Sequence, residues 1–426
     1  MTNYGENIVQ IMNALLKNPG IGLIIYGAGQ FGRELIGDLT KRGVSPLCIC
    51  DGNESLHGTE IDGIIVISID EAKKRFGDFK LFIASKRYLY EIIYGLTENK
   101  NILKEQIINY VPVTKKISCR FLNEVCVISG DSLTFCCADF GRNKPLSVSF
   151  TGDYNEVTNN FFSLREQIFS ELNENVLNAC SHCKNLQEEY FSIQTSIYEQ
   201  IGFLNNSNGG ICNFRCNYCN SIAKNATSVS EKIEFHKLVD IMQAKGRINQ
   251  NTISQISTGE ITIHPNRNDI YNAIRFFKYN LIFTNALIYD KYISDILSSS
   301  RGEIYVSMDS GKRETFAKIK GVDVFNRVCD TLHRYSKESK NAIILKYILL
   351  PGINDNSAEI DEFFKLACEL CVHSVIISSD GGNPHLVTED TIKMAEYFHY
   401  KAKEFSILCE TNSDVIEKAT RIRNCY

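Results

Sequence analysis

Short apolar runs alternate with amphipathic stretches along the first part of the chain. The runs are too short for helices and predict buried strands at residues 21–26, 46–50, 64–69 and 80–84. The apolar spacing after the first run predicts a helix to about Lys41, and Asp70 and Glu71 open another. Strands that alternate with helices predict a parallel sheet with right-handed crossovers.

The same rhythm returns in the last part of the chain. Apolar runs predict strands at residues 255–258, 281–284, 304–308, 342–350 and 374–378. Polar-faced helices are expected between them, at 267–279, 323–339 and 358–369. With one more strand before Cys212, about six β/α units result, which predicts an open, partial β/α barrel.

The middle of the chain has a different pattern. Residues 116–190 are rich in Gly, Asp and Asn, and they predict a helix only around 162–172. Such a segment cannot bury much apolar surface, so a metal centre would have to supply part of its stability. The expected fold class is therefore α/β in three parts, with domains at 1–115, 116–190 and 191–426.

Composition and charge narrow the class of protein. The chain has 426 residues and a net charge of −4, which gives no basic field for nucleic acid or an anionic membrane. No apolar run approaches the ~20 residues of a spanning helix. The first ten residues do not resemble a secretory signal, so a cytoplasmic location is expected. Aromatic residues do not interleave with basic ones as single-stranded nucleic acid sites require.

Sixteen cysteines are the unusual feature of the composition. In a reducing compartment, cysteines at short fixed spacing indicate metal binding or catalysis rather than disulfides. Two groups stand out, one between residues 119 and 183 and one between 212 and 219. The other seven are expected to be small buried hydrophobic residues, namely Cys48, Cys50, Cys329, Cys368, Cys371, Cys409 and Cys425.

Cys212, Cys216 and Cys219 carry the sharpest signal. Their spacing is C-x3-C-x2-C, with the aromatic Tyr218 before the last cysteine. Three thiolates on one short loop can hold three irons of a [4Fe–4S] cluster and leave the fourth iron open for a ligand. The alternative is a zinc site, although no fourth Cys or His follows within the loop.

This loop and the motifs after it resemble the radical S-adenosylmethionine (SAM) enzymes. Gly259 and Glu260 resemble the family's GGE-type motif, which implies contact with the amino group of SAM. Asn285 follows the third barrel strand, Ser307 and Asp309 the fourth, and Lys346 lies on the fifth. The resemblance implies that these residues, with Tyr218, bind SAM or substrate at the carboxyl ends of the barrel strands.

The resemblance also implies a mechanism and partners. The reduced cluster passes an electron to SAM, and the resulting 5′-deoxyadenosyl radical abstracts hydrogen from the substrate. A flavodoxin or ferredoxin would supply the electron. A dry barrel mouth would protect the radical from water.

The first cysteine group resembles a SPASM or twitch segment, which holds an auxiliary cluster in relatives. The resemblance implies a second [4Fe–4S] cluster on Cys119, Cys136, Cys180 and Cys183. The gap from Gly130 to the cysteine pair is one residue longer than usual, so Cys137 is open as an alternative to Cys136. The segment also precedes the barrel instead of following it. Structural zinc on the same four cysteines is the alternative.

A glycine-rich loop follows the first predicted strand. Gly27, Gly29 and Gly32 match G-x-G-x-x-G, and Asp51 lies at the distance where a ribose-binding acid is expected. This pattern resembles small Rossmann-like domains of sugar-modifying proteins. Nucleotide or nucleotide-sugar binding is one reading, and a docking domain whose glycines serve only strand–helix packing is the other.

Together these features predict an enzyme that cleaves SAM and oxidises or epimerises a small carbohydrate or nucleotide-linked substrate. A peptide-modifying radical SAM enzyme is the alternative within the class. A non-enzymatic iron–sulfur or zinc scaffold is the alternative outside it. The sequence does not indicate the substrate itself, the stereochemical outcome or the oligomeric state.

Overall fold

The computed structural model describes residues 4–85, 88–136, 146–193, 199–208, 210–219, 232–339, 342–372, 374–380 and 387–411. The chain divides into an N-terminal unit, Met1–Cys119 with Ile168–Ile197, and a barrel unit, Arg120–Gln167 with Tyr198–Tyr426. The segment expected at 116–190 is thus distributed over both units. In the described ranges, no helix has the length and apolarity needed to cross a membrane.

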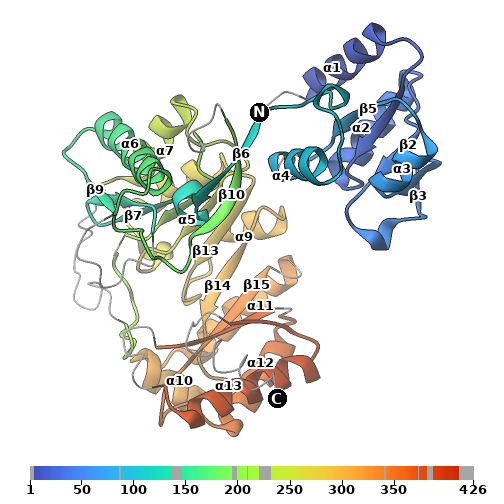
Figure 1. The fold of residues 1–426 in the computed structure, drawn as a ribbon. Coiled ribbons are helices and arrows are strands. Elements are labelled where there is room, and N and C mark those ends of the chain that lie inside the picture. Colours follow the sequence, from blue (N-terminus) through green and yellow to red (C-terminus); the bar gives the residue numbers. More distant parts are fainter. Residues whose placement is uncertain are drawn as a thin grey trace. The chain divides into compact units, whose positions relative to one another are not determined.

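A five-stranded sheet forms the centre of the N-terminal unit (Figure 1). The four expected strands are confirmed and run parallel, namely β1 (Gly22–Tyr26), β2 (Cys48–Cys50), β4 (Ile64–Ile67) and β5 (Phe79–Ile83). The order is β3-β4-β2-β1-β5, with β3 (Glu60–Ile61) as an antiparallel edge. The order in which successive strands are added to the sheet therefore reverses between β1 and β5, which is where such sheets bind ligands.

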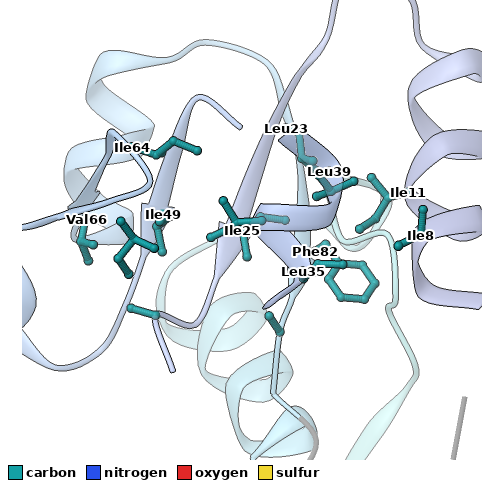
Figure 2. Close-up of a cluster of buried hydrophobic side chains, with 14 residues drawn as sticks. Ile8, Ile11, Leu23, Ile25, Leu35, Leu39, Ile49, Ile64, Val66 and Phe82 are labelled. Atoms are coloured by element: carbon teal, nitrogen blue, oxygen red, sulfur yellow. The ribbon is translucent and has the colours of Figure 1, made fainter. Parts of the chain in front are cut away.

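Helices cover both faces of this sheet. Ile25 faces α1 (Tyr4–Lys17) and α2 (Gln30–Lys41), whose apolar side chains complete the cluster drawn in Figure 2. Ile24 belongs to a second cluster with α3 (Ile69–Arg75) and α4 (Leu89–Tyr94). Because neighbouring strand residues point to opposite faces, burial of both faces gives the uninterrupted apolar runs seen in the sequence.

The middle of the chain is more regular than its pattern indicates. Helix α6 (Tyr154–Asn173) begins eight residues before the predicted start, because Asp153 Oδ1 accepts the amide hydrogen of Asn155 at 2.7 Å and caps the first turn. A short helix, α5 (Arg120–Glu124), was not expected. Strands β6 (Val113–Ser118) and β10 (Gln187–Ser192) pair antiparallel in the N-terminal unit.

The barrel unit is built on a ten-stranded sheet of order β17-β16-β15-β14-β13-β12-β11-β7-β8-β9. Its parallel strands include the six that the sequence predicts, namely β11 (Phe203–Asn206), β12 (Ile253–Ile256), β13 (Tyr279–Phe283), β14 (Gly302–Ser307), β15 (Ile343–Leu349) and β16 (Ser374–Ser379). In the described part of the chain the sheet does not close, so the expected partial barrel is confirmed.

Strands at both edges extend this sheet beyond the six expected units. Parallel strands β7 (Val125–Ser129) and β17 (Leu408–Thr411) flank β11 and β16. Beyond β7, the short strands β8 (Ser132–Thr134) and β9 (Ser147–Ser149) pair antiparallel.

After β11, helices alternate with the parallel strands of the barrel unit along the chain. They are α7 (Phe235–Ala244), α8 (Arg267–Ile274), α9 (Lys291–Ser298), α10 (Arg313–Lys320), α11 (Phe325–Glu338), α12 (Ser357–Glu369) and α13 (Glu389–Glu404). The predicted helix at 267–279 was wrong at its end. Tyr279 instead begins β13 and pairs with Ile253, and these ladder hydrogen bonds exclude the helix.

The two faces of the barrel sheet carry different side chains. Tyr347 of β15 contacts Phe363 of α12 and Phe398 of α13, so helices cover its face. Lys346 is adjacent along the strand and therefore points to the opposite face. Ser307 of β14 is its register partner and shares that face.

Some cysteines outside the two groups are not where the sequence predicts. Cys48 and Cys50 are buried in the N-terminal core, as expected. Cys368 and Cys371 are exposed, so their prediction as core residues was wrong. Both lie at the end of α12, where Cys371 takes a positive φ of 52° that directs the chain away from the helix.

Candidate functional site

The three cysteines of the C-x3-C-x2-C motif lie on the loop that follows β11, and all are half-buried. The amide of Arg215 donates to the Lys320 carbonyl at 2.9 Å, and that of Asn217 to the Ile319 carbonyl at 3.0 Å. The last carbonyls of a helix have no partner within it. The loop amides therefore cap α10, and this anchors the cysteine loop to the barrel.

Gly321 allows this close approach. It ends α10 with a φ of +69°, and a Cβ there would lie 2.7 Å from the Arg215 carbonyl oxygen. Any other residue would be strained at that φ and would push the cysteine loop away.

Without a metal, burial favours the protonated thiol form of these cysteines. Burial raises the pKa of the Cys212 thiol, and the nearby Cys216 and Cys219 raise it further. Burial also raises the pKa of Cys216. Iron would replace those protons, and three neighbouring thiolates are the donor set of a [4Fe–4S] cluster with one open iron. Among the described residues, no three His, Cys, Asp or Glu side chains form a group that could hold a single metal ion.

The loop after β12 packs directly on the approach to these cysteines. The Glu260 amide donates to the Ile211 carbonyl at 2.9 Å. A Cβ at Gly259 would lie 2.4 Å from the Gly210 carbonyl oxygen, so no side chain fits there. The close approach of the two backbones therefore explains why the predicted GGE-type motif has glycine at position 259.

Glu260 is fully buried, and its carboxylate is well satisfied. Oε1 accepts from the Thr262 amide at 3.1 Å, the Thr262 hydroxyl at 2.7 Å and the Thr284 hydroxyl at 2.8 Å. Oε2 accepts from the Asn285 amide at 2.6 Å. Burial raises the pKa of Glu260 and these bonds oppose the rise. The carboxylate thus joins the exits of β12 and β13, and its contact with SAM stays a prediction.

Asn285 brings the third strand to the cysteine loop. Its side-chain amide donates to Asn213 Oδ1 at 2.6 Å and lies 3.9 Å from Cys212 Sγ. Three residues singled out in the sequence, Cys212, Glu260 and Asn285, are therefore together in the structure. Amide donors near cluster sulfurs are typical of iron–sulfur sites.

Tyr218 and Asp309 meet a residue that the sequence analysis missed. This residue is Lys320. The Tyr218 hydroxyl donates to Asp309 Oδ2 at 2.8 Å, and the Lys320 ammonium donates to the Tyr218 hydroxyl and to Asp309 Oδ2. Burial raises the pKa of Tyr218 well above its ordinary value, and Asp309 adds to the rise. Lys320 precedes the glycine that ends α10, a position that usually indicates an exposed helix end.

Lys346 stands apart from that network. Burial lowers the pKa of its ammonium, and Asp309 opposes the change. Within the ranges that the structure describes, its side chain takes part in no hydrogen bond or ion pair. A partly desolvated ammonium of this kind can bind an anionic group of a ligand.

The glycine loop of the N-terminal unit has the packing that its pattern predicts. Gly27 has a φ of +119°, and a Cβ at Gly32 would lie 1.9 Å from the Gly27 carbonyl oxygen. Gly29 faces open space. Asp51 Oδ2 accepts the Ala28 amide hydrogen at 2.7 Å and so holds the loop itself. Nucleotide binding by these residues stays a prediction.

The auxiliary cysteines fall in both units. Cys119 and Cys180 are buried and Cys183 is half-buried in the N-terminal unit, while Cys136 is buried in the barrel unit. Cys119 follows β6, and Cys183 lies shortly before β10, at the end of the antiparallel pair where Ser118 pairs with Gln187. Cys137 lies outside the described residues, and the choice between it and Cys136 stays open.

An open parallel β/α sheet with three cysteines on the loop after β11 is the arrangement that the cysteine motif predicts. Residues 209–367 match the family model described as the radical SAM superfamily. The chain therefore contains a radical SAM domain, and the resemblance noted in its motifs is confirmed.

Curated relatives match part of the chain. The GTP 3′,8-cyclase of Clostridium acetobutylicum is 24% identical over 163 residues, which are 38% of this chain and 51% of the relative. The GTP 3′,8-cyclase of Chlorobaculum tepidum is 27% identical over 37% of this chain and 47% of its own length. The chain thus spans about half the length of these relatives.

Solved structures match at low identity. Streptococcus suis SuiB bound to the precursor peptide SuiA has a TM-score of 0.43 and 13% identity, over 72% of this chain and 75% of that one. The anSMEcpe structure with bound AdoMet has a TM-score of 0.40 and 15% identity, over 49% of this chain and 63% of that one.

Proposed function

We propose that this chain is an enzyme that binds a [4Fe–4S] cluster and SAM in its barrel unit and removes a hydrogen atom from a small, phosphate-bearing substrate. When bound, the cluster and SAM supply the one-electron cleavage that yields the hydrogen-abstracting radical. The radical SAM domain supports the class of reaction. The unpaired Lys346 is the observation that supports the substrate class.

The chain's own residues divide the work in this proposal. Cys212, Cys216 and Cys219 would hold the cluster, and the capping of α10 keeps their loop in place. Glu260 and Asn285 fix the loops beside it through buried hydrogen bonds. Ser307 and Lys346 are register partners on neighbouring strands, where they would orient the substrate.

Lys346 favours a nucleotide-linked or phosphorylated sugar substrate. Within the described residues the partly buried Lys346 ammonium makes no hydrogen bond or ion pair, and a phosphate would satisfy it with charge-assisted hydrogen bonds. The named activity of the curated relatives concerns GTP, a nucleotide. We propose oxidation or epimerisation of such a substrate as the outcome.

Two further proposals concern the glycine loop of the N-terminal unit and the first cysteine group. Gly29, with open space above it, and the uncapped start of α2 support binding of a phosphate group in the N-terminal unit. Cys119, Cys136, Cys180 and Cys183 are proposed to hold a second [4Fe–4S] cluster. Iron analysis tests the proposal of a second cluster, since two [4Fe–4S] clusters give about eight irons per chain.

Binding of GTP and of guanosine tests the role of Lys346. Calorimetry on the anaerobically reconstituted protein with SAM is expected to show tighter binding of GTP. Lys346→Met should weaken GTP binding by about tenfold or more, the loss of one charge-assisted hydrogen bond, and leave guanosine unaffected. Lys346→Arg should retain most of the affinity.

The matched control is Lys318→Met, which removes an exposed lysine of the same unit. It should leave GTP binding unchanged. Two results would contradict the substrate class. One is equal affinity of the unaltered protein for GTP and guanosine, and the other is equal affinity of the unaltered protein and Lys346→Met for GTP.

A further inference from the structure

Lys320 is a lysine that the barrel unit buries almost completely. Its side chain is 1% exposed, and that of its ion-pair partner Asp309 is fully buried. The ammonium also donates to the Tyr218 hydroxyl at 2.8 Å and lies over the ring of Tyr218. Lysine is almost never buried to this extent unless it is paired.

The pair is embedded in a complete hydrogen-bond network. Asp309 Oδ1 accepts the Ile348 amide hydrogen at 2.8 Å, and Oδ2 accepts from Tyr218 and Lys320. Asn354 donates to the Asp309 carbonyl at 2.8 Å. Asp309 also holds a φ of +59°, which is uncommon for a residue with a side chain. The fold therefore keeps both charges at one defined place despite their desolvation.

That place adjoins the cysteine loop. Tyr218, which bridges Lys320 and Asp309, lies between Cys216 and Cys219 in the sequence. The Lys320 carbonyl accepts the Arg215 amide of the same loop. One residue thus anchors the loop through its backbone and brings a buried positive charge next to it.

A buried charge beside the cysteine loop would act on the cluster through the protein interior, which screens charges less than water does. A reduced cluster carries one more negative charge than an oxidised one, and the protein tunes its potential through nearby charge and burial. A buried ammonium stabilises the reduced form, and a buried carboxylate stabilises the oxidised form. Neither effect needs contact with the iron.

We propose that Lys320 is a positioning residue whose buried ammonium, balanced by Asp309, sets the reduction potential of the cluster on Cys212, Cys216 and Cys219. This inference rests on the proposed function. The two members of the pair should act in opposite directions, whereas damage to the loop would shift the potential in the same direction for both.

Redox titration followed by electron paramagnetic resonance (EPR) tests this, on reconstituted protein before SAM is added. Lys320→Met should lower the ratio of reduced to oxidised cluster about tenfold at a fixed potential, a shift of ~59 mV. Asp309→Asn should raise that ratio. The double variant, which removes both charges, should return towards the unaltered protein.

An exposed pair between the first residue of α10 and the loop after that helix gives the matched control. Arg313 and Asp323 form an ion pair whose side chains are about half exposed. Arg313→Met and Asp323→Asn should leave the potential unchanged, because water and salt screen exposed charges.

Each outcome decides the proposal. Shifts of the same sign in Lys320→Met and Asp309→Asn, or no shift in either, overturn it. If Lys320→Met fails to bind iron, Asp309→Asn alone still decides, since an unchanged or lowered ratio contradicts the proposal. Absence of a cluster from the unaltered protein would instead refute the proposed function, and the two failures are thereby distinguished.

Discussion

At the scale of single residues, Glu260 joins the loops of the candidate site. Its buried carboxylate accepts four hydrogen bonds from Thr262, Thr284 and Asn285. Buried polar groups of this kind are expensive to leave unsatisfied, since the interior offers no water as a substitute. The residue that the motif marks for SAM therefore also has a structural role.

Glu260→Gln is predicted to destabilise the protein by about 1–3 kcal/mol. The amide group of Gln has only one acceptor oxygen, so an N–H must face either the Asn285 amide or the threonine donors. Urea-induced unfolding of the protein measures the change.

Glu369→Gln is the control, because Glu369 is exposed in the last turn of α12. It should change stability by less than about 0.5 kcal/mol. Equal stability of Glu260→Gln and Glu369→Gln would show that the four bonds contribute nothing.

The sequence also could not indicate which charged residues would be buried. Lys320 lies in the last turn of α10, where lysine usually extends into solvent and interacts with the helix dipole. Its burial depends on Tyr218 and Asp309, which are 102 and 11 residues away along the chain. Such long-range pairs leave no local pattern.

At the scale of elements, the parallel strands were predictable and the edges of the sheets were not. Strands β1 and β12–β16 are buried on at least one face, which produces the apolar runs that mark them. By contrast, β3 has two residues and β8 and β9 have three each, too few for a pattern to emerge. Strand β7 is apolar, but it follows α5 without a turn signal.

One hydrogen bond between two elements gives a pH-dependent prediction. His399 of α13 shares a hydrogen bond of 2.9 Å with Thr411 of β17. Burial lowers the pKa of His399 below 6.5. The unfolded chain therefore binds the proton more readily, and stability falls as the pH decreases below about 6.5.

Comparison with His399→Gln isolates this contribution, since Gln is neutral and can still bond to Thr411. Between pH 7.5 and 5.5, the unaltered protein should lose stability relative to the variant, with a slope no steeper than about 1.4 kcal/mol per pH unit. Urea midpoints at several pH values report it. A constant or growing advantage of the unaltered protein at low pH would contradict the assignment.

At the scale of the whole molecule, the sequence predicts a functional site best where the residues of that site are close together in the chain. Cys212, Cys216 and Cys219 belong to one loop, and residues 209–367 match a radical SAM model. The auxiliary set is different, because Cys136 and Cys180 are far apart in sequence and belong to different units. No local spacing rule links such distant cysteines, so their joint binding of a cluster stays a prediction.

Each of the two units contributes a different observation on the class of substrate. Lys346 of β15 supports a phosphate-bearing substrate by a specific charge. The glycine loop of the N-terminal unit supports nucleotide binding only by its packing, since Asp51 bonds to the loop itself. The barrel unit therefore carries the stronger argument.

The most direct test of the account is the EPR spectrum of the dithionite-reduced protein, recorded with and without SAM. The unaltered protein should give a cluster signal that SAM alters, because SAM occupies the open iron. Replacement of Cys212, Cys216 and Cys219 by alanine should abolish that alteration even if a second cluster still gives a signal. A spectrum indifferent to SAM, or a SAM effect that survives in the triple variant, would contradict the central claim.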